Sequence, residues 1–496
     1  MIVLLSGMLA HQCNVAVAWV FSPSSRQSDH NNLSFTRRNL HTAVISPFAT
    51  SSPVIPADDE DSDKSRKIVA DLFTKEDNPQ QFAELCELLD ATPVDLLRFD
   101  SQNDDGVRGV YLNRAVQAGD ILLSLPLDSC LVDQRSPKWL SSEVSDSSDK
   151  WATRLAASWI DLYLKHELNE ESSDGISLWM SLLPDPELLK ASLPVHWPEE
   201  TVQNARSTSL EIAVDSAYFS RAEAVQDLVE SLEGYKDCKA LLKSVDDMQN
   251  LSHRALDLIQ TRSCRLDSKS SNDGDTNGFC RVLAPGFDFI NHGARCDADA
   301  SLRDDGCANA QFEMENENGK ECLVVRALTD LKGDEEVLID YGFSARPAWK
   351  CLMSYGFVPK YNQQSPDDNS AEVYMFGKRY DITTETIPFE MVEAASTAGA
   401  DFDEDRSEDN APIEEVQLTP EIARKIADRV QEVGFFLLLE PDLDPYEAFD
   451  ESEESQETSL DPMEVLSHTL AASLRWSQHK VLLTCASQLE EFAGGA

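Results

Sequence analysis

The spacing of hydrophobic residues divides the chain between strands and helices. Short apolar runs at Val107–Leu112 and Ile121–Pro126, each beside a glycine-containing turn, predict two strands of a small antiparallel β unit. From residue 150 to about residue 267, apolar residues recur every three or four positions, which predicts helices. Strand character then returns in three segments, Cys280–Ile290, Cys322–Leu328 and Glu336–Tyr341. We therefore expect a β domain that contains a helical insert.

Helical periodicity also marks both flanks of this β domain. Ser65–Leu89 predicts one or two helices that lead into it. Beyond Pro359, the clearest periodic apolar faces lie in Thr419–Leu439 and Pro462–Phe492, between acidic segments of low complexity. These patterns predict a helical C-terminal domain with disordered acidic insertions.

The length of 496 residues exceeds that of one ordinary domain, and the hydrophobic content of 42% is enough for sizeable cores. We expect a targeting presequence or disordered segment over residues 1–60. The β domain and its N-terminal helices are expected over residues 61–360, with the helical insert at about 135–265. The helical C-terminal domain is expected over residues 361–496.

The charge balance restricts the classes of partner. The net charge is −47, from 89 acidic and 42 basic residues. Such a chain is repelled by nucleic acid and by anionic membranes, so we expect neither as a partner. The acidic residues gather in Asp58–Asp63, Asp401–Glu415 and Glu440–Glu457. We interpret these runs as solvated loops or disordered insertions, with a clamp for a basic substrate face as the alternative.

The cysteines do not indicate a metal site. None of the 11 cysteines forms a C-x-x-C pair, and their spacings are irregular. This pattern supports neither a disulfide framework nor a zinc cluster. We expect mostly buried free thiols in a reducing compartment and no bound metal.

The N-terminal residues have the composition of a targeting segment. The apolar runs Ile2–Ala10 and Val15–Phe21 are each too short to span a bilayer. Residues 16–18 have the small-residue pattern of a signal cleavage site, although a basic region before it is missing. Ser22–Pro56 is rich in Ser, Thr, Asn and Pro and carries three arginines against one acidic residue, as transit peptides do.

Together these N-terminal segments resemble the bipartite presequence of algae with complex plastids, with Phe21 as the aromatic residue at the junction. We therefore expect a plastid protein. A mitochondrial presequence and a disordered tail on a cytoplasmic protein are the alternatives. No later apolar run is long enough to span a bilayer, so we expect no membrane segment in the mature chain.

Three short motifs carry candidate chemistry: Asp288–His292, Asp340–Gly342 and Tyr355–Phe357. Each alone is more often a strand end, a turn or a core segment. Their order and spacing resemble the cofactor and catalytic segments of a SET-domain protein methyltransferase, of the class of the Rubisco large-subunit lysine methyltransferase. Further segments in the family order are Arg108–Tyr111, Ala118–Leu122, Leu193–Trp197, Thr261-Arg262 and Leu331–Glu335.

The resemblance covers roughly residues 95–360 and implies the fold class: α+β, with a SET β-fold interrupted by a helical insert and followed by a mainly α-helical C-terminal domain. It also implies S-adenosyl-L-methionine as the cofactor and Tyr341 as the catalytic residue. The implied cofactor-binding residues are Gly106, Val107, Arg108, Arg262, Asn291, His292 and Phe357. Tyr355 is the implied wall of a channel for the substrate lysine.

The chain departs from the family pattern at several positions. Phe343–Pro347 stands where most relatives show a Ser-Asn pair that opens a helix. Gly293 stands where serine is common, and Gly106 stands where an acidic residue often precedes the glycines. These departures fall on cofactor contacts more than on the fold.

The chemistry implied by the resemblance is in-line methyl transfer to a neutral amine, without a metal. A phenol with a pKa near roughly 10 is a poor base at neutral pH, so Tyr341 is expected to orient the acceptor. We predict a protein-lysine N-methyltransferase that acts on a non-histone protein, with Rubisco or another stromal protein as a candidate substrate. The alternatives are a histidine methyltransferase of the same fold, a catalytically silent SET-like binding module, and an acidic scaffold with a fortuitous likeness. The oligomeric state is not indicated.

Overall fold

The structure is a computed structural model. It describes residues 43–44, 78–100, 108–168, 174–235, 237–267, 279–294, 306–342, 347–359, 370–375, 377–384, 386–397, 417–438 and 461–494.

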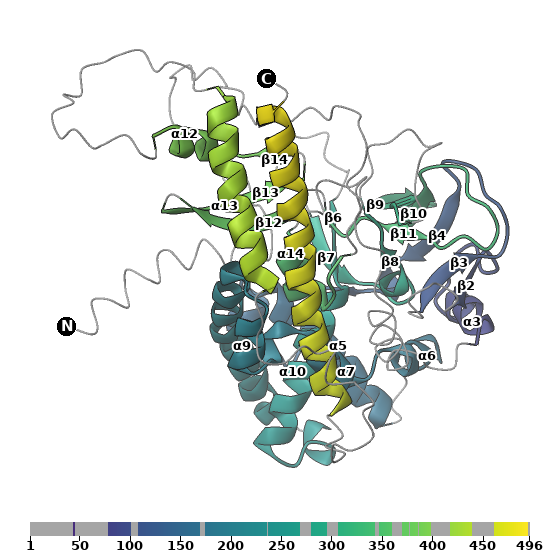
Figure 1. Cartoon of the computed structure of the whole chain (residues 1–496). Helices are drawn as coiled ribbons and strands as arrows, with labels where there is room; N and C mark the ends of the chain where they lie inside the picture. The colour runs from purple at the N-terminus through teal and green to yellow at the C-terminus, as the bar shows by residue number, and fades with distance from the viewer. Residues whose placement is uncertain are drawn as a thin grey trace, which may run out of the picture.

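Short strands form the β part of the fold, on the right of Figure 1. Their bounds are β2 Leu97–Asp100, β3 Gly109–Leu112, β4 Ile121–Pro126, β5 Leu131–Val132, β6 Cys264–Asp267, β7 Phe279–Leu283, β8 Asn291–His292, β9 Ala310–Glu317, β10 Lys320–Ala327 and β11 Leu338–Ile339. One sheet has the order β4-β10-β9-β11-β8, another the order β5-β7-β6, and β2 pairs with β3. Helix α3 (Gln80–Leu88) precedes these strands, with Phe82 and Leu85 buried.

The expected antiparallel unit of two neighbouring strands is wrong in its pairing. Strand β3 pairs with β2, with Leu112 opposite Leu97. Strand β4 pairs instead with β10, with Leu125 opposite Leu323. All four residues of β3 are buried. Each strand pairs with the strand that completes a buried apolar face, and β4 finds that strand in a distant part of the chain. The spacing of turns in the sequence does not indicate which strand this is.

A helical insert separates β5 from β6 and forms the lower lobe in Figure 1. Its helices are α4 Ser142–Ser145, α5 Trp151–Glu167, α6 Asp174–Leu182, α7 Pro186–Ser192, α8 Glu199–Asn204, α9 Thr208–Gly234 and α10 Val245–Arg262, with 3-10 turns η2 Pro194–His196 and η3 Asp237–Ala240. The last part of the predicted helical stretch is formed by two helices, α9 and α10. Helix α10 begins at its own capping box, in which Ser244 and Asp247 satisfy each other's backbone N–H groups.

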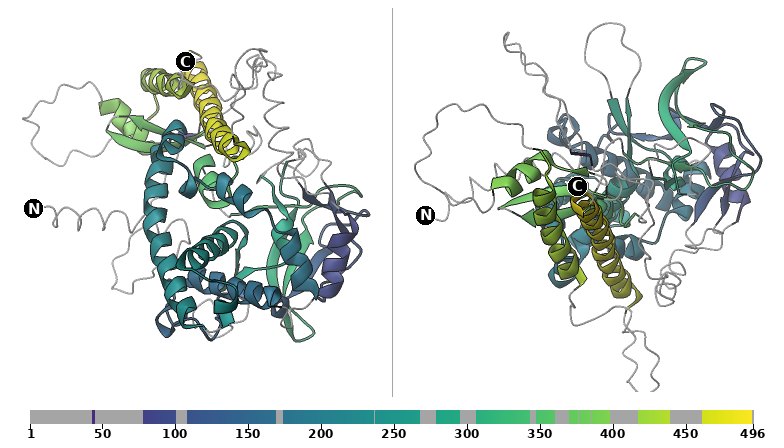
Figure 2. Two further views of the ribbon diagram at one scale, coloured as in Figure 1. Left: turned by 90° about the horizontal axis from the view of Figure 1, so that it is seen from below. Right: turned by 45° about the horizontal axis from the view of Figure 1, so that its top comes forward.

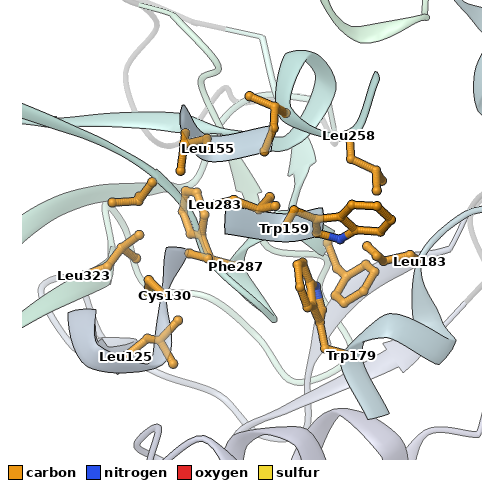
Figure 3. Close-up of a cluster of buried hydrophobic side chains, with 14 of the residues drawn as sticks. Leu125, Cys130, Leu155, Trp159, Trp179, Leu183, Leu258, Leu283, Phe287 and Leu323 are labelled. Atoms are coloured by element: carbon orange, nitrogen blue, oxygen red, sulfur yellow. The ribbon is translucent and has the colours of Figure 1, made fainter. Parts of the chain in front are cut away.

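The largest core joins the insert to the strands. Figure 3 shows Trp159 of α5 and Trp179 of α6 beside Leu283 and Phe287, with Leu323 of β10 in the same cluster. Both tryptophans are fully buried. Because one continuous core spans both parts, the insert and the β-fold are packed as one unit.

The C-terminal part begins after α11 (Ala348–Tyr355). Its elements are β12 Ser370–Met375, β13 Lys378–Thr383, β14 Thr386–Ile387, α12 Phe389–Thr397, α13 Pro420–Leu438 and α14 Pro462–Gly494. Helices α13 and α14 lie side by side in both panels of Figure 2, in lime and yellow. They share a core with the β12–β13 hairpin, which includes Val373, Ile382, Val430 and Leu482. The hairpin was not expected from the sequence, and neither was the pairing of β14 with β1 (Ala43–Val44).

A third cluster ties this C-terminal part to the rest of the chain. Leu474 of α14 packs with Leu352 of α11 and with Trp197 and Leu210 of the insert. The expected fold class, an α+β fold with a helical insert and a mainly α-helical C-terminal region, is confirmed.

The described cysteines are mostly buried thiols, as expected. Eight are free, and of these Cys264 is partly exposed while the others are buried. Cys307 is disulfide-bonded, which the sequence did not lead us to expect. Within the described ranges, no helix is both long and apolar enough to cross a membrane. No cluster of three or more His, Cys, Asp or Glu side chains in the same ranges is arranged to hold a metal ion.

Candidate active site

Two of the sequence motifs meet through a parallel strand pair. Leu338 and Ile339 of β11 lie opposite Asn291 and His292 of β8. Two residues beyond this pairing, the backbone N–H of Tyr341 donates to Nδ1 of His292 at 3.3 Å. Segments 50 residues apart in sequence are therefore adjacent in space.

Gly293 follows β8 at a position where the backbone of Ala308 lies too close to leave room for a side chain. Its N–H donates to the Ile339 carbonyl at 2.9 Å. A Cβ atom at this position would lie 2.6 Å from the backbone nitrogen of Ala308 and 2.7 Å from its Cα. Since backbone atoms cannot yield as a flexible side chain does, a glycine here has a physical reason where relatives commonly have serine.

The Tyr341 hydroxyl is held by a main-chain group. It donates to the carbonyl oxygen of Ile290 at 2.7 Å. Burial raises the pKa of Tyr341, and the positive charge of Arg262 opposes that rise. The phenol is therefore neutral at physiological pH and has a fixed orientation.

The Tyr341 ring belongs to a group of four aromatic rings. The centroids of His292, Tyr341, Tyr355 and Phe357 lie between 4.9 and 6.3 Å apart in the five pairs that touch. The hydroxyl of Tyr355 donates to the Tyr341 carbonyl at 3.1 Å. Gly356 ends α11 in the left-handed conformation with φ 77°, which turns Phe357 back toward the cluster.

Asn291 connects this cluster to β3. Its Nδ2 donates to the Arg108 carbonyl at 3.1 Å and to Oε1 of Glu336 at 2.8 Å. The other carboxylate oxygen of Glu336 accepts from the Tyr111 hydroxyl at 3.3 Å. A side chain at Gly109 would overlap the Glu336 carboxylate, so the glycine leaves room for it. Glu336 thus fixes the orientation of Asn291.

The Arg108 side chain points into the packing of the fold. Its guanidinium lies 4.8 Å from the ring centroid of Phe99 and 4.7 Å from that of Phe289. Its Nη2 donates to the Leu182 carbonyl at 2.8 Å. The side chain therefore links α6 to the β-fold, and only its main chain takes part in the contacts around Asn291.

Arg262 ends helix α10 against a buried carboxylate. Its Nη1 donates to the Asp288 carbonyl at 2.8 Å and lies 3.4 Å from the carboxylate oxygen Oδ2. Asp288 also accepts from Nε1 of Trp179 at 3.2 Å and from the Gly286 N–H at 3.0 Å. Burial raises the pKa of Asp288, and Arg262 opposes this rise. Among the described residues, the buried Nε of Arg262 finds no hydrogen-bond partner.

The structure brings together most of the residues expected from the sequence. Asn291, His292, Tyr341, Tyr355 and Phe357 form one contiguous group, which Arg108 joins through its carbonyl. Arg262 is held beside the group by Asp288. Two expected cofactor-binding residues, Gly106 and Val107, lie outside the described residues.

Sequence reasoning gave no role to Glu336, and it included Asp288 only as the first residue of the Asp288–His292 motif. Asp288 is an acidic residue between Phe287 and Phe289, and an acid inside an apolar run is the signal that could have identified it. Glu336 opens the expected strand Glu336–Tyr341 and carried no distinguishing pattern.

Comparison with known families agrees with this geometry. Residues 107–342 match the family model of the SET domain, and the chain therefore carries a SET domain over this range. The SET domain in the expected resemblance is confirmed. The chain matches no curated protein sequence at a significant level.

Several solved structures are similar to most of the chain at low sequence identity. The SET domain of LSMT bound to lysine and AdoHcy is 16% identical, with a TM-score of 0.49 over 83% of this chain and 91% of that chain. Rubisco LSMT bound to sinefungin and monomethyllysine is 14% identical, with a TM-score of 0.48 over 83% and 91%. Rubisco LSMT bound to AdoMet is 13% identical, with a TM-score of 0.47 over 84% and 91%.

Proposed function

We propose that the chain is a protein-lysine N-methyltransferase that uses S-adenosyl-L-methionine and acts on a non-histone protein. The observation that carries the proposal is Tyr341, whose neutral hydroxyl is fixed on the Ile290 carbonyl and whose ring lies against the rings of His292 and Tyr355. A group so fixed is suited to orienting an acceptor nitrogen, because alignment of the reacting atoms is a large part of the barrier to in-line transfer.

The residues present fit the proposed cofactor. The Nε of Arg262 is a buried donor without a partner among the described residues, which suits a carboxylate. Asn291 offers an amide oxygen and His292 its main chain, while Phe357 supplies an apolar ring. Gly106, Val107 and Arg108 would contribute main-chain groups. The cofactor supplies an electrophilic methyl group on a sulfonium.

The protein residues would prepare the acceptor. A lysine side chain has a reference pKa near roughly 10.4 and must lose its proton before it attacks. Contact with the rings of Tyr341 and Tyr355 removes water from the bound side chain, and this loss of hydration disfavours the charged ammonium. Tyr341 would then accept a hydrogen bond from the neutral amine while its own O–H continues to donate to the Ile290 carbonyl. In this account, the residues position the amine and exclude water.

The charge and the N-terminal composition support a stromal protein substrate. A net charge of −47 favours a basic or neutral protein partner. We propose that residues 1–60 direct the chain to a plastid, where Rubisco or another stromal protein is the substrate. We propose no nucleic-acid partner and no membrane segment in the mature chain. The oligomeric state is left open.

The proposal is tested by binding and transfer with one labelled cofactor. The purified chain should bind radiolabelled S-adenosylmethionine and should label a protein in a plastid extract. The Asn291→Ala variant should bind it more weakly, and Asn250→Ala, at an exposed position of α10, is the same-residue control. Label on a histidine would identify the histidine methyltransferase alternative. Cofactor binding without any labelled protein would indicate the silent module, and the absence of both would overturn the proposal.

A further inference from the structure

Gln260 connects the two helices that carry residues on opposite sides of the candidate active site. It lies on α10, two residues before Arg262, and its Nε2 donates to the Met353 carbonyl oxygen at 2.5 Å. Met353 lies on α11, two residues before Tyr355. Arg262 belongs to the side proposed for the cofactor, and Tyr355 belongs to the side proposed for the substrate lysine. The hydrogen bond therefore joins the helix of one to the helix of the other.

The carbonyl that Gln260 contacts lies in the last turn of α11. Carbonyl groups in the last turn of a helix have no donor within the helix and need one from elsewhere. The Gly356 N–H donates to the Leu352 carbonyl at 3.0 Å, and Gln260 supplies the donor for Met353. A Cβ atom at Gly356 would lie 2.5 Å from the Oγ of Ser192 on α7. The helical insert therefore holds the end of α11 at two places.

The orientation of the Gln260 amide is fixed by its two partners. Nη1 of Arg221 donates to the Oε1 atom of Gln260 at 3.1 Å. A guanidinium can only donate and a carbonyl oxygen can only accept, so the amide oxygen must face Arg221 and the amide nitrogen must face Met353. A glutamate at this position would keep the contact with Arg221 and lose the donor to Met353.

Arg221 is itself held in place by a buried carboxylate. It lies on α9, which packs against α10 in the lower lobe of Figure 1. Its Nη2 donates to Oδ1 of Asp257 at 2.5 Å, and both side chains are buried. Nε2 of His196 lies 2.9 Å from the same oxygen. Because a buried charge without its partner is strongly unfavourable, Arg221 stays beside Asp257 and presents a fixed donor to Gln260.

The position of Tyr355 depends on the end of α11. Its hydroxyl donates to the Tyr341 carbonyl at 3.1 Å, and the centroids of the two rings lie 4.9 Å apart. These contacts hold the side chain, whereas the last turn of α11 sets the main chain that carries it. Met353 is buried, and a buried carbonyl without a donor is unfavourable. Loss of the Gln260 amide should therefore displace this turn and Tyr355 with it.

We propose that Gln260 is a positioning residue of the candidate active site, which fixes the last turn of α11, and with it Tyr355, relative to Arg262. Arg221 and Asp257 take part by orienting the Gln260 amide. The expected effect on methyl transfer rests on the proposed function, whereas the effect on the position of Tyr355 requires no activity.

The first test observes the Tyr355 ring directly. The full chain, without cofactor, is labelled with fluorotyrosine, and the fluorine NMR signal of Tyr355 is assigned by its loss in Tyr355→Phe. Gln260→Glu and Gln260→Met both lack the donor to Met353, so both should shift or broaden this signal. Gln260→Glu keeps the acceptor for Arg221 and Gln260→Met does not, so a change common to both variants reports the lost donor.

Matched controls separate positioning from a general loss of structure. Gln249→Glu makes the same substitution at an exposed position of α10 and should leave the Tyr355 signal unchanged. The signal of Tyr374, which is exposed on β12, should be the same in every variant. An unchanged Tyr355 signal in both Gln260 variants would overturn the proposal. A change spread over all the tyrosine signals would also overturn it, because it would indicate loosening of the whole fold.

The second test measures methyl transfer from radiolabelled S-adenosylmethionine to a plastid extract. Gln260→Met should lower the rate about tenfold, because a displaced channel wall misaligns the acceptor. Saturating cofactor should not restore the rate, whereas it would restore that of a variant that is only less stable. Full transfer by Gln260→Met would overturn the positioning role. Absence of transfer by the unmodified chain would contradict the proposed function and leave the result for the Tyr355 signal standing.

Discussion

The orientation of Tyr341, the residue proposed to position the acceptor, is fixed by a main-chain carbonyl group. The Tyr341 hydroxyl donates to the Ile290 carbonyl, and burial raises the pKa of the phenol, so it keeps its proton at physiological pH. An oriented neutral phenol positions the acceptor and does not remove the proton from the lysine ammonium.

This assignment predicts the pH dependence of transfer. The reactive fraction of a lysine rises with pH up to its pKa of roughly 10.4, so the rate at saturating cofactor should rise from pH 7 to pH 10. Because the pKa of Tyr341 is shifted upward, its ionisation should cause no decline within that range. A falling limb below pH 10 that Tyr341→Phe removes would contradict the assignment.

Glu336 is expected to matter through Asn291. Its carboxylate accepts from Asn291 and Tyr111 together, so Glu336→Ala leaves the Asn291 amide less firmly oriented. Loss of one such hydrogen bond, worth about 1 kcal/mol, should weaken S-adenosylmethionine binding about fivefold. Glu321→Ala, at an exposed position of β10, is the control. Equal affinities in calorimetric titrations of the two variants would rule out this role.

The sequence indicated some of these residues and not others. Asn291, His292 and Tyr341 were identified because they belong to short motifs whose order resembles that of a known family. Glu336 and Asp288 were not, because their importance comes from partners distant in sequence. Asn291 is 45 residues from Glu336, and Trp179 is 109 residues from Asp288. A single sequence does not contain those pairings.

At the scale of elements, periodicity predicted helices well and strand pairing poorly. Helices α5, α13 and α14 follow their expected ranges closely, because a helix buries a face defined by its own residues. The positions of strands β3 and β4 were predicted correctly, but the two were wrongly expected to pair with each other. The backbone hydrogen bonds of a strand depend on its neighbour in the sheet, which its own residues do not specify. The β12–β13 hairpin was not predicted from the sequence.

The junction of β8 with the following segment should tolerate no side chain. Gly293→Ala would place a Cβ atom against the backbone of Ala308, and such overpacking costs about 1–3 kcal/mol. The thermal unfolding midpoint should fall accordingly, and cofactor binding should fall with it. Gly306→Ala meets nothing within 4 Å and is the matched control. An unchanged midpoint for Gly293→Ala would show that the segment can move aside.

At the scale of the whole molecule, three cores join the SET domain, its insert and the C-terminal helices. The cluster around Leu474, Leu352 and Trp197 places α14 against both α11 and the insert. Since α11 carries Tyr355, the C-terminal part is packed against the element that forms one wall of the candidate site.

The targeting proposal also belongs to the whole molecule. A fusion of residues 1–56 to a fluorescent protein should accumulate in the plastid of an alga with a complex plastid. Phe21→Ala should retain the fusion outside the stroma, because that residue is the aromatic at the junction, and Phe35→Ala should have no effect. Fluorescence in the cytosol or mitochondria would contradict the plastid assignment.

The central claim is methyl transfer positioned by Tyr341, and one paired measurement tests it most directly. Transfer from radiolabelled S-adenosylmethionine to plastid proteins is measured for the unmodified chain and for Tyr341→Phe, and cofactor affinity is measured on the same samples. We expect a labelled lysine with the unmodified chain and a rate reduced about 100-fold in the variant, since misplacing the acceptor costs this much, with nearly equal affinity for the cofactor. Equal transfer rates for the two proteins would contradict the claim.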